Sequence, residues 1–329
     1  MRKTNPLLIL CLSLLCACTQ VREDELALQT IDRRHLPPAD LTLEIDGLGP
    51  CTNQPDRTLR LSSRDPVVVL VHGCLASTGR FRALAEVFAF QGQQAICFTY
   101  DDRDSLRTSG HELRLALDEL AQRMDQQPIT LIGHSQGGLI SRYALTESGP
   151  AASALSENEH RLVTLSTPFS GIESADHCGW KAAHVLSLGL VVGICKLISG
   201  DKWFEITSAS DFIQDPPSLN PGVLDHLVVA TDERDSCRVQ DHDGCIEDDY
   251  VFSLEEQRLP AKAETPLVRK KLVRAGHAEI VGDSRTVPHK LIDLLQREEI
   301  LHATSPDELQ AFRQHLQHLF VDAPIAAHP

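Results

Sequence analysis

Short apolar runs alternate with amphipathic stretches along most of the chain. Residues 67–71 form a continuous run of valine and leucine after Pro66, which is typical of a strand buried on both faces of a parallel sheet. Helical patterns separate such runs, and Ser109 and Glu112 fit a capping box at the start of one helix. The pattern predicts strands at residues 66–71, 95–100, 129–132, 161–166, 226–231 and 267–275, and helices at 79–91, after 109, and at 136–147, 286–297 and 306–320.

This alternation of strand and helix predicts an α/β fold. Strands joined through helices form right-handed crossovers, so we expect a doubly wound, mostly parallel sheet with helices on both faces. Ligands of such sheets bind at the carboxyl ends of the strands, where the loops converge. Candidate functional residues should therefore follow strands.

The interval between Phe169 and Asp225 interrupts the alternation. It contains Trp180, Trp203 and an apolar stretch at residues 186–198 that is too short to span a membrane. We expect an insertion at about residues 170–225 that forms a helical lid over the crevice. An additional core helix is the alternative.

The first residues have the pattern of an export signal. Arg2 and Lys3 precede an apolar run at residues 7–15, which predicts a signal peptide over residues 1–17. The run ends Leu-Cys-Ala-Cys at Cys18, which resembles the lipobox of bacterial lipoproteins and implies lipidation of Cys18. Thr19 follows instead of aspartate, and in Gram-negative lipoproteins this favours the outer membrane. The alternative is an ordinary cleaved signal with an incidental cysteine.

Composition predicts one large domain after this leader. We expect a lipidated N-terminus and polar tether over residues 18–40 and a single globular domain over 41–329, monomeric and held at the cell envelope by its lipid. The formal net charge of -15, with no basic stripe, argues against nucleic acid as a partner.

The cysteines beyond Cys18 are odd in number, and in an exported protein most should pair. Cys237 and Cys245 bracket a polar loop and form the first expected pair. Cys178 and Cys195 bracket the lid segment and form the second. The spacing matches no zinc motif, and we expect no metal or organic cofactor.

The strongest chemical motif is Gly-His-Ser-Gln-Gly-Gly at residues 133–138. It lies directly between the strand at 129–132 and a helix, which is the context that a nucleophile elbow requires. The strand-to-helix turn would present Ser135 to the crevice. A serine in an ordinary turn is the alternative, and the flanking strand and helix argue against it.

In this motif and in the order of its elements, the chain resembles the α/β-hydrolase superfamily, within it the lipases and esterases. The resemblance implies the α/β-hydrolase fold over most of the chain after the tether. His72 and Gly73 resemble the family's turn after the oxyanion strand, so the backbone N–H groups of Cys74 and Gln136 are the expected oxyanion hole. Residues 165–171 resemble a segment of the family that lies at the end of a strand. Phe169 differs from the family there, because a polar residue is common at this position.

A serine nucleophile needs a base that a carboxylate orients. His277 follows a strand pattern and precedes a terminal helix, as the base does in the family. His134 in the elbow, His289 in a helix pattern and His242 in the cysteine-bracketed loop fit structural or solvent-facing roles.

Several carboxylates compete for the role of the acid. Asp248 is the first choice, because residues 247–251 resemble the segment that contains the family's acid. Two alternatives for the acid are Asp249, its immediate neighbour, and Asp232, which lies at the end of a predicted strand. The remaining acidic residues of this region fit a solvated loop.

These residues predict a serine hydrolase of carboxylic esters that acts through an acyl-enzyme. The lid and the anchor favour lipid or acyl esters, whereas a short-chain esterase, a thioesterase or a phospholipase would use the same residues. An inactive hydrolase-like lipoprotein that binds lipid or a protein partner is the alternative from another class.

The anchor is tested by Cys18→Ala. Removal of the lipidation site should release the protein from the membrane fraction, because no acyl chain then holds it there. Fractionation followed by immunoblotting measures the distribution. A variant that stays in the membrane fraction as the wild type does would contradict lipidation.

Overall fold

The computed structural model describes residues 27–74, 76–146, 158–175, 202, 204–242, 244–283 and 286–320. The expected signal peptide, Cys18, residues 176–201 and 203 of the expected lid, and the expected pair of Cys178 with Cys195 lie outside these residues.

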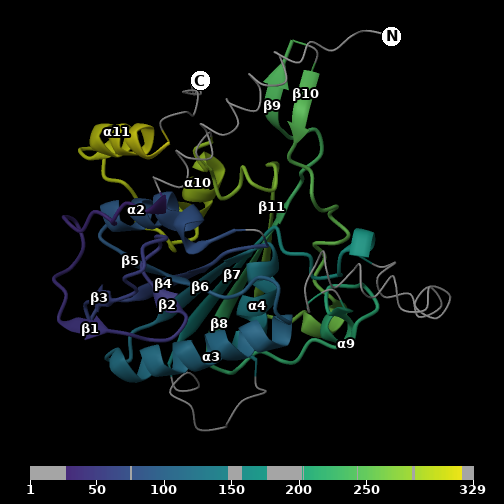
Figure 1. Ribbon diagram of the computed structural model, residues 1–329, viewed down its shortest axis with the longest axis horizontal. Helices are drawn as coiled ribbons and strands as arrows, with labels where there is room; N and C mark the ends of the chain where they lie inside the picture. The colour runs from purple at the N-terminus through teal and green to yellow at the C-terminus, as the bar shows by residue number, and fades with distance from the viewer. Residues whose placement is uncertain are drawn as a thin grey trace.

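A seven-stranded sheet forms the centre of the molecule, with strand order β11-β8-β7-β6-β4-β5-β2. All neighbouring strands pair in parallel except β2, which is antiparallel to β5. The sheet and its twist are visible in Figure 1. Its strands are β2 (Leu48–Gly49), β4 (Val67–Val71), β5 (Gln94–Phe98), β6 (Ile129–His134), β7 (His160–Leu165), β8 (Val223–Thr231) and β11 (Val268–Val273).

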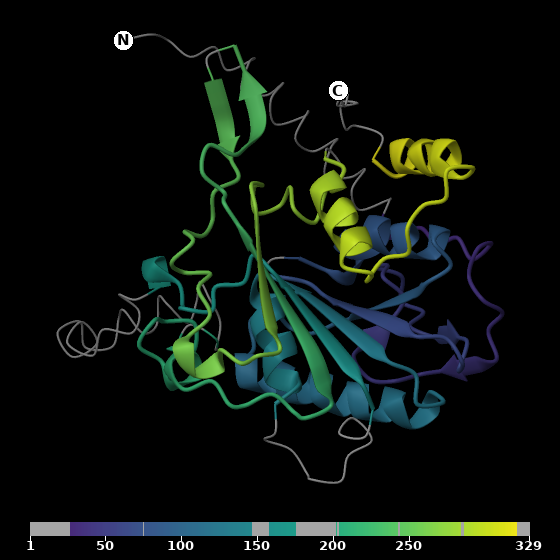
Figure 2. The same cartoon turned by 180° about the vertical axis from the view of Figure 1, so that it is seen from behind.

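Helices cover both faces of this sheet. The helices α3 (Leu106–Arg123) and α4 (Gln136–Ala144) lie on one face, and α2 (Arg82–Phe90), α10 (His289–Arg297) and α11 (Leu309–Leu319) lie on the other, as Figures 1 and 2 show from opposite sides. Shorter helical turns are η1 (Thr78–Phe81), η2 (Glu173–Ala175), α9 (Asp211–Gln214) and η4 (Ala261–Ala263).

The valine run of β4 shows why the sequence folds this way. Val67, Val69 and Val71 pack in the core on the α3 and α4 side, whereas Val68 and Leu70 pack in the core on the α2 and α10 side. Alternate residues of a strand point to opposite faces, so a strand covered on both faces must be apolar at every position. The predicted fold class is confirmed.

The start of α3 differs from the prediction. The helix begins at Leu106, and Ser105 is its N-cap, with the hydroxyl accepting a hydrogen bond of 3.0 Å from the Thr108 amide. Ser109, the predicted cap, is buried inside the helix. Both serines are good capping residues, and apolar packing of Leu106 in the core favours the earlier start.

Two small antiparallel two-stranded sheets lie outside the main sheet. In one, β1 (Leu41–Leu43) pairs with β3 (Leu59–Leu61). In the other, β9 (Cys237–Asp241) and β10 (Gly244–Asp248) project away from the carboxyl end of β8 (Figure 2). The expected disulfide between Cys237 and Cys245 is confirmed and joins this hairpin.

A second disulfide, between Cys51 and Cys97, was not predicted. It joins the segment after β2 to β5 across 46 residues of sequence, and both cysteines are completely buried. Among the described residues Cys74 is the free thiol.

Candidate active site

Ser135 lies at a sharp turn between β6 and α4. Its backbone has φ 56° and ψ -127°, a conformation that costs energy in a residue with a side chain. The Ser135 amide donates a hydrogen bond of 2.9 Å to the carbonyl of Leu165 at the end of β7, which holds the turn in place. This is the geometry of a nucleophile elbow.

Glycines bring the end of β4 against this turn. A Cβ atom at Gly137 would collide with the carbonyl oxygens of Val71 and His72, and one at Gly73 would lie 2.9 Å from the Ser135 Cβ. The residues after β4 therefore lie directly beside the serine. The Tyr100 hydroxyl donates a hydrogen bond of 2.6 Å to the His72 carbonyl and its ring stacks on the His72 ring, which fixes the position of this loop.

His277 lies beside the elbow, in the turn after β11. His134, the neighbour of Ser135, donates a hydrogen bond of 2.9 Å from Nε2 to the His277 carbonyl oxygen, and the two rings are 4.7 Å apart between centroids. Burial, and then the nearby His277, hold the pKa of His134 well below its usual range, so His134 is neutral at pH 7 and has a structural contact here.

The carboxylate at the His277 ring is that of Glu233. Glu233 Oε1 is 3.0 Å from His277 Nδ1, and the Glu233 side chain is fully buried. Oε1 also accepts hydrogen bonds from the hydroxyls of Ser166 and Thr231, at 2.5 and 2.9 Å. Oε2 accepts two from the backbone amides of residues 251 and 252, at 2.6 and 2.8 Å.

These donors keep Glu233 ionised. Burial alone would raise the pKa of Glu233, but the hydrogen bonds from His277, Ser166 and Phe252 together with the charge of His277 outweigh it, and the pKa is lowered. An ionised carboxylate only accepts hydrogen bonds, so His277 Nδ1 must bear the proton. In the neutral imidazole the other ring nitrogen, Nε2, then has no proton and can accept one.

The carboxylates chosen from the sequence have other partners. Asp248 is exposed on β10 and accepts a hydrogen bond from the Tyr250 amide, because the hairpin directs this strand away from the sheet. Asp232 pairs with Arg234 at 2.7 Å. Asp249 accepts hydrogen bonds from the amides of residues 278 and 279, and its backbone oxygen accepts one from the His277 amide. Of the carboxylates at this end of the sheet, Glu233 is the one whose side chain contacts the His277 ring.

The sequence analysis did not predict Glu233, although it predicted its neighbour Asp232 as a candidate acid. Both Asp232 and Glu233 follow β8 directly, so their position in the sequence does not separate them. The turn after β8 directs Glu233 inward and Asp232 toward Arg234, which no local sequence pattern indicates.

The two residues expected to form the oxyanion hole lie on either side of a buried lysine. Gln136 is the first residue of α4, where backbone amides have no partner within the helix. Lys202 Nζ lies 2.8 Å from Gln136 Oε1 and 3.0 Å from Cys74 Sγ, and it also donates to the Asp102 carbonyl. Lys202 therefore joins the loop after β4 to the start of α4, a contact that sequence reasoning missed.

Within the described residues, no hydrogen bond joins Ser135 Oγ to His277. Such bonds are often long before a substrate binds and shorten in the complex. The other histidines of the sequence analysis lie elsewhere: His289 begins α10, and His242 lies at the tip of the β9–β10 hairpin.

The described part of the chain contains no group of three or more His, Cys, Asp or Glu side chains arranged to hold a metal ion. In the same residues, no helix combines the length and apolar character needed to cross a bilayer.

Comparisons with known proteins agree with the fold. A sequence model of the α/β-hydrolase fold family matches residues 66–180, less than half of the chain. The propeptide form of Bacillus licheniformis lipase BlEst2 matches with a TM-score of 0.51 and 18% identity over 78% of this chain and 54% of that one. The chain thus spans about half the length of that form.

Two further solved structures have lower scores. The mature form of the same lipase has a TM-score of 0.47 and 18% identity over 77% of this chain and 97% of that one. Est816, described as an N-acyl homoserine lactone degrading enzyme, has a TM-score of 0.40 and 14% identity over 78% and 99%. A comparison with curated proteins gives no significant sequence match. The chain has the α/β-hydrolase fold.

The role of the contact between Glu233 and His277 is tested by Glu233→Gln. The amide preserves the shape but removes the charge that stabilises a protonated His277, so any turnover that uses His277 as the base should fall roughly 10²- to 10⁴-fold in kcat. Steady-state kinetics measure this loss, and circular dichroism checks the fold.

Asp248→Asn is the matched control, because it also replaces a carboxylate by its amide in the same region. Its kcat should stay near the wild-type value. The opposite order, with Asp248→Asn inactive and Glu233→Gln active, would restore the assignment made from the sequence.

Proposed function

We propose that this protein is a serine hydrolase of carboxylic esters, with Ser135 as nucleophile, His277 as base and Glu233 as the acid that orients the base. The observation that supports it most is the contact of 3.0 Å between Glu233 and His277, beside a serine in a strained elbow. A buried ionised carboxylate on one imidazole nitrogen leaves the other nitrogen basic, which is the arrangement that activates a serine hydroxyl.

The reaction then follows two steps. Ser135 Oγ attacks the ester carbonyl while His277 Nε2 takes the hydroxyl proton, and the tetrahedral intermediate collapses when His277 returns that proton to the leaving alcohol. A water molecule next attacks the acyl-enzyme with the same base, releasing the carboxylic acid and restoring Ser135. Glu233 stabilises the imidazolium in both steps.

The oxyanion of each intermediate would be stabilised by the backbone N–H groups of Cys74 and Gln136. The amide of Gln136 is at a helix N-terminus, where the partial positive charge favours an anion. One such donor contributes on the order of 3 kcal/mol to lowering the barrier. Lys202, which contacts both side chains, would fix the distance between the two donors.

Lipid or acyl esters are the proposed substrates, and the cell envelope is the proposed location. The lipobox-like sequence at Cys18 supports an anchor in the outer membrane, which would bring the site beside acyl chains. Two disulfides are compatible with export to an oxidising compartment.

The nucleophile is tested with a fluorophosphonate probe on the protein without its leader. The wild type should become labelled, and Ser135→Ala should not, because the probe phosphonylates an activated serine with loss of fluoride. Ser141→Ala is the matched control, since this serine lies on the helix that Ser135 begins, and it should retain labelling. Equal labelling of Ser135→Ala, or no labelling of the wild type, would reject the hydrolase.

The same preparation assayed with nitrophenyl esters of increasing acyl length identifies the substrate class. Turnover of long-chain esters supports the lipid assignment. Activity confined to acetyl and butyryl esters would contradict that assignment and leave a short-chain esterase.

A further inference from the structure

Ser166 contacts both members of the pair formed by Glu233 and His277. It is the first residue after β7, and it is completely buried. Its hydroxyl oxygen lies 2.5 Å from Glu233 Oε1 and 3.0 Å from His277 Nδ1. One hydroxyl therefore contacts two of the three side chains to which the proposed function assigns the chemistry.

The charge of Glu233 determines the direction of these hydrogen bonds. An ionised carboxylate can only accept, so the Ser166 hydroxyl donates its proton to Oε1. The hydroxyl oxygen keeps its lone pairs, and His277 Nδ1–H, which donates to Glu233 at 3.0 Å, lies at the same distance from Ser166 Oγ. The ring proton is thus shared between two acceptors that follow different strands, and two acceptors restrict the orientation of the ring more than one does.

The backbone of Ser166 is strained where it makes these contacts. Its φ of 48° is unfavourable for a residue with a Cβ atom, and Ser135, which follows the neighbouring strand β6, also has a positive φ. The Ser166 amide donates a hydrogen bond of 2.9 Å to the Val229 carbonyl of β8. Strain of this kind persists only where the surroundings determine the conformation, and it is concentrated at functional sites.

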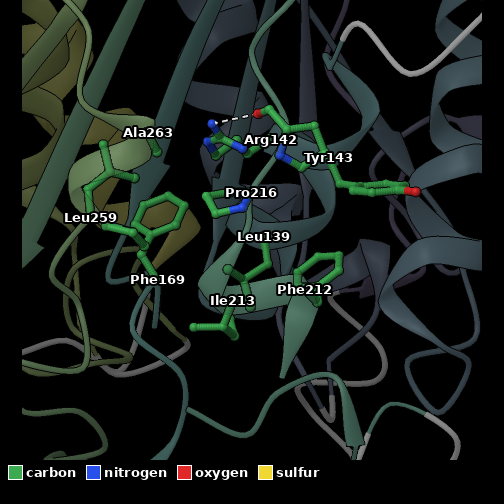
Figure 3. Close-up of a pocket in the computed structure, with 11 residues that line it drawn as sticks. Leu139, Arg142, Tyr143, Phe169, Phe212, Ile213, Pro216, Leu259 and Ala263 are labelled. Carbon is green, nitrogen blue, oxygen red and sulfur yellow. Dashed lines mark hydrogen bonds between the residues drawn. The ribbon is translucent and has the colours of Figure 1, made fainter. Parts of the chain in front are cut away.

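The segment that follows Ser166 is tightly packed. A Cβ atom at Gly138 would collide with Thr167 Oγ1, so α4 lies directly against this segment. Phe169 is buried in the apolar wall of a small cavity beside α4 (Figure 3). The cavity measures about 20 Å³, which leaves room for about one water molecule. Packing therefore holds Ser166 in a conformation that its own backbone disfavours.

We propose that Ser166 is a positioning residue of the hydrolase, which fixes the His277 ring and the Glu233 carboxylate relative to each other so that His277 Nε2 is directed at Ser135. This inference rests on the proposed function. Proton transfer from Ser135 requires a fixed orientation of the base, and a misplacement of about 1 Å can cost on the order of 10²-fold in rate. Ser166 itself exchanges no proton with the substrate and acts through His277.

Steady-state kinetics of Ser166→Gly test this role. Glycine adopts a positive φ without strain, so the variant removes the hydroxyl while relieving the backbone. We expect kcat to fall roughly 10- to 100-fold with KM within about twofold, because the lost hydrogen bonds are made to the base and the acid and not to the substrate. Ser166→Ala keeps the strain and should lose the same activity. Equal losses in two variants of different thermal stability assign the effect to the hydroxyl.

Thr231→Val is the matched comparison, since it removes another buried hydroxyl that donates to Glu233 Oε1. The hydrogen bonds of Thr231 Oγ1 are with Ser166, Glu233 and Gln257. Thr231→Val should therefore lose clearly less activity than either Ser166 variant. A loss as large as theirs would overturn the proposal, because the number of donors to the carboxylate would then decide the rate. Unchanged kcat in both Ser166 variants would overturn it as well.

Proton NMR of His277 Nδ1–H tests the contact without any turnover. The resonance should move in Ser166→Gly, because one of the two acceptors of this proton is lost, and should stay near its wild-type position in Thr231→Val. A resonance that does not respond to Ser166→Gly would reject the positioning role. Absence of ester turnover in the wild type would instead reject the proposed function, so the two failures are distinguishable.

Discussion

The contact between Glu233 and His277 is the interaction on which the candidate site depends. A fully buried carboxylate is stable only if donors replace its hydration, and Glu233 has five. Ser166 and Thr231 come from the ends of β7 and β8, and two backbone amides come from the segment after the β9–β10 hairpin. The same contacts that keep the carboxylate ionised also fix the proton on His277 Nδ1.

Sheet order explains how residues distant in sequence meet at this point. The strands β6, β7, β8 and β11 are parallel neighbours, and Ser135, Ser166, Glu233 and His277 each follow one of them. Because their carboxyl ends lie at one edge of the sheet, four separate loops converge there. The positive φ angles of Ser135 and Ser166 turn the chain sharply at two of these ends, a strain that the packed strands must offset.

The parts of this account that depend on local patterns could be predicted from the sequence. The valine run of β4 and the glycines around Ser135 indicate the fold and the elbow, because each has a direct steric cause. The acid could not be predicted, since residues 232–249 contain many carboxylates and the turn after β8 selects among them. Lys202 and the contact of Ser166 with His277 have no local signal, because their partners come from distant segments.

Proton NMR of the His277 ring tests the central claim most directly. A strongly hydrogen-bonded Nδ1–H gives a downfield resonance that exchanges slowly because the bond is buried. The account predicts this resonance in the wild type and in Asp248→Asn, and its loss or marked upfield shift in Glu233→Gln. A resonance unchanged in Glu233→Gln but lost in Asp248→Asn would contradict the claim that Glu233 orients the base.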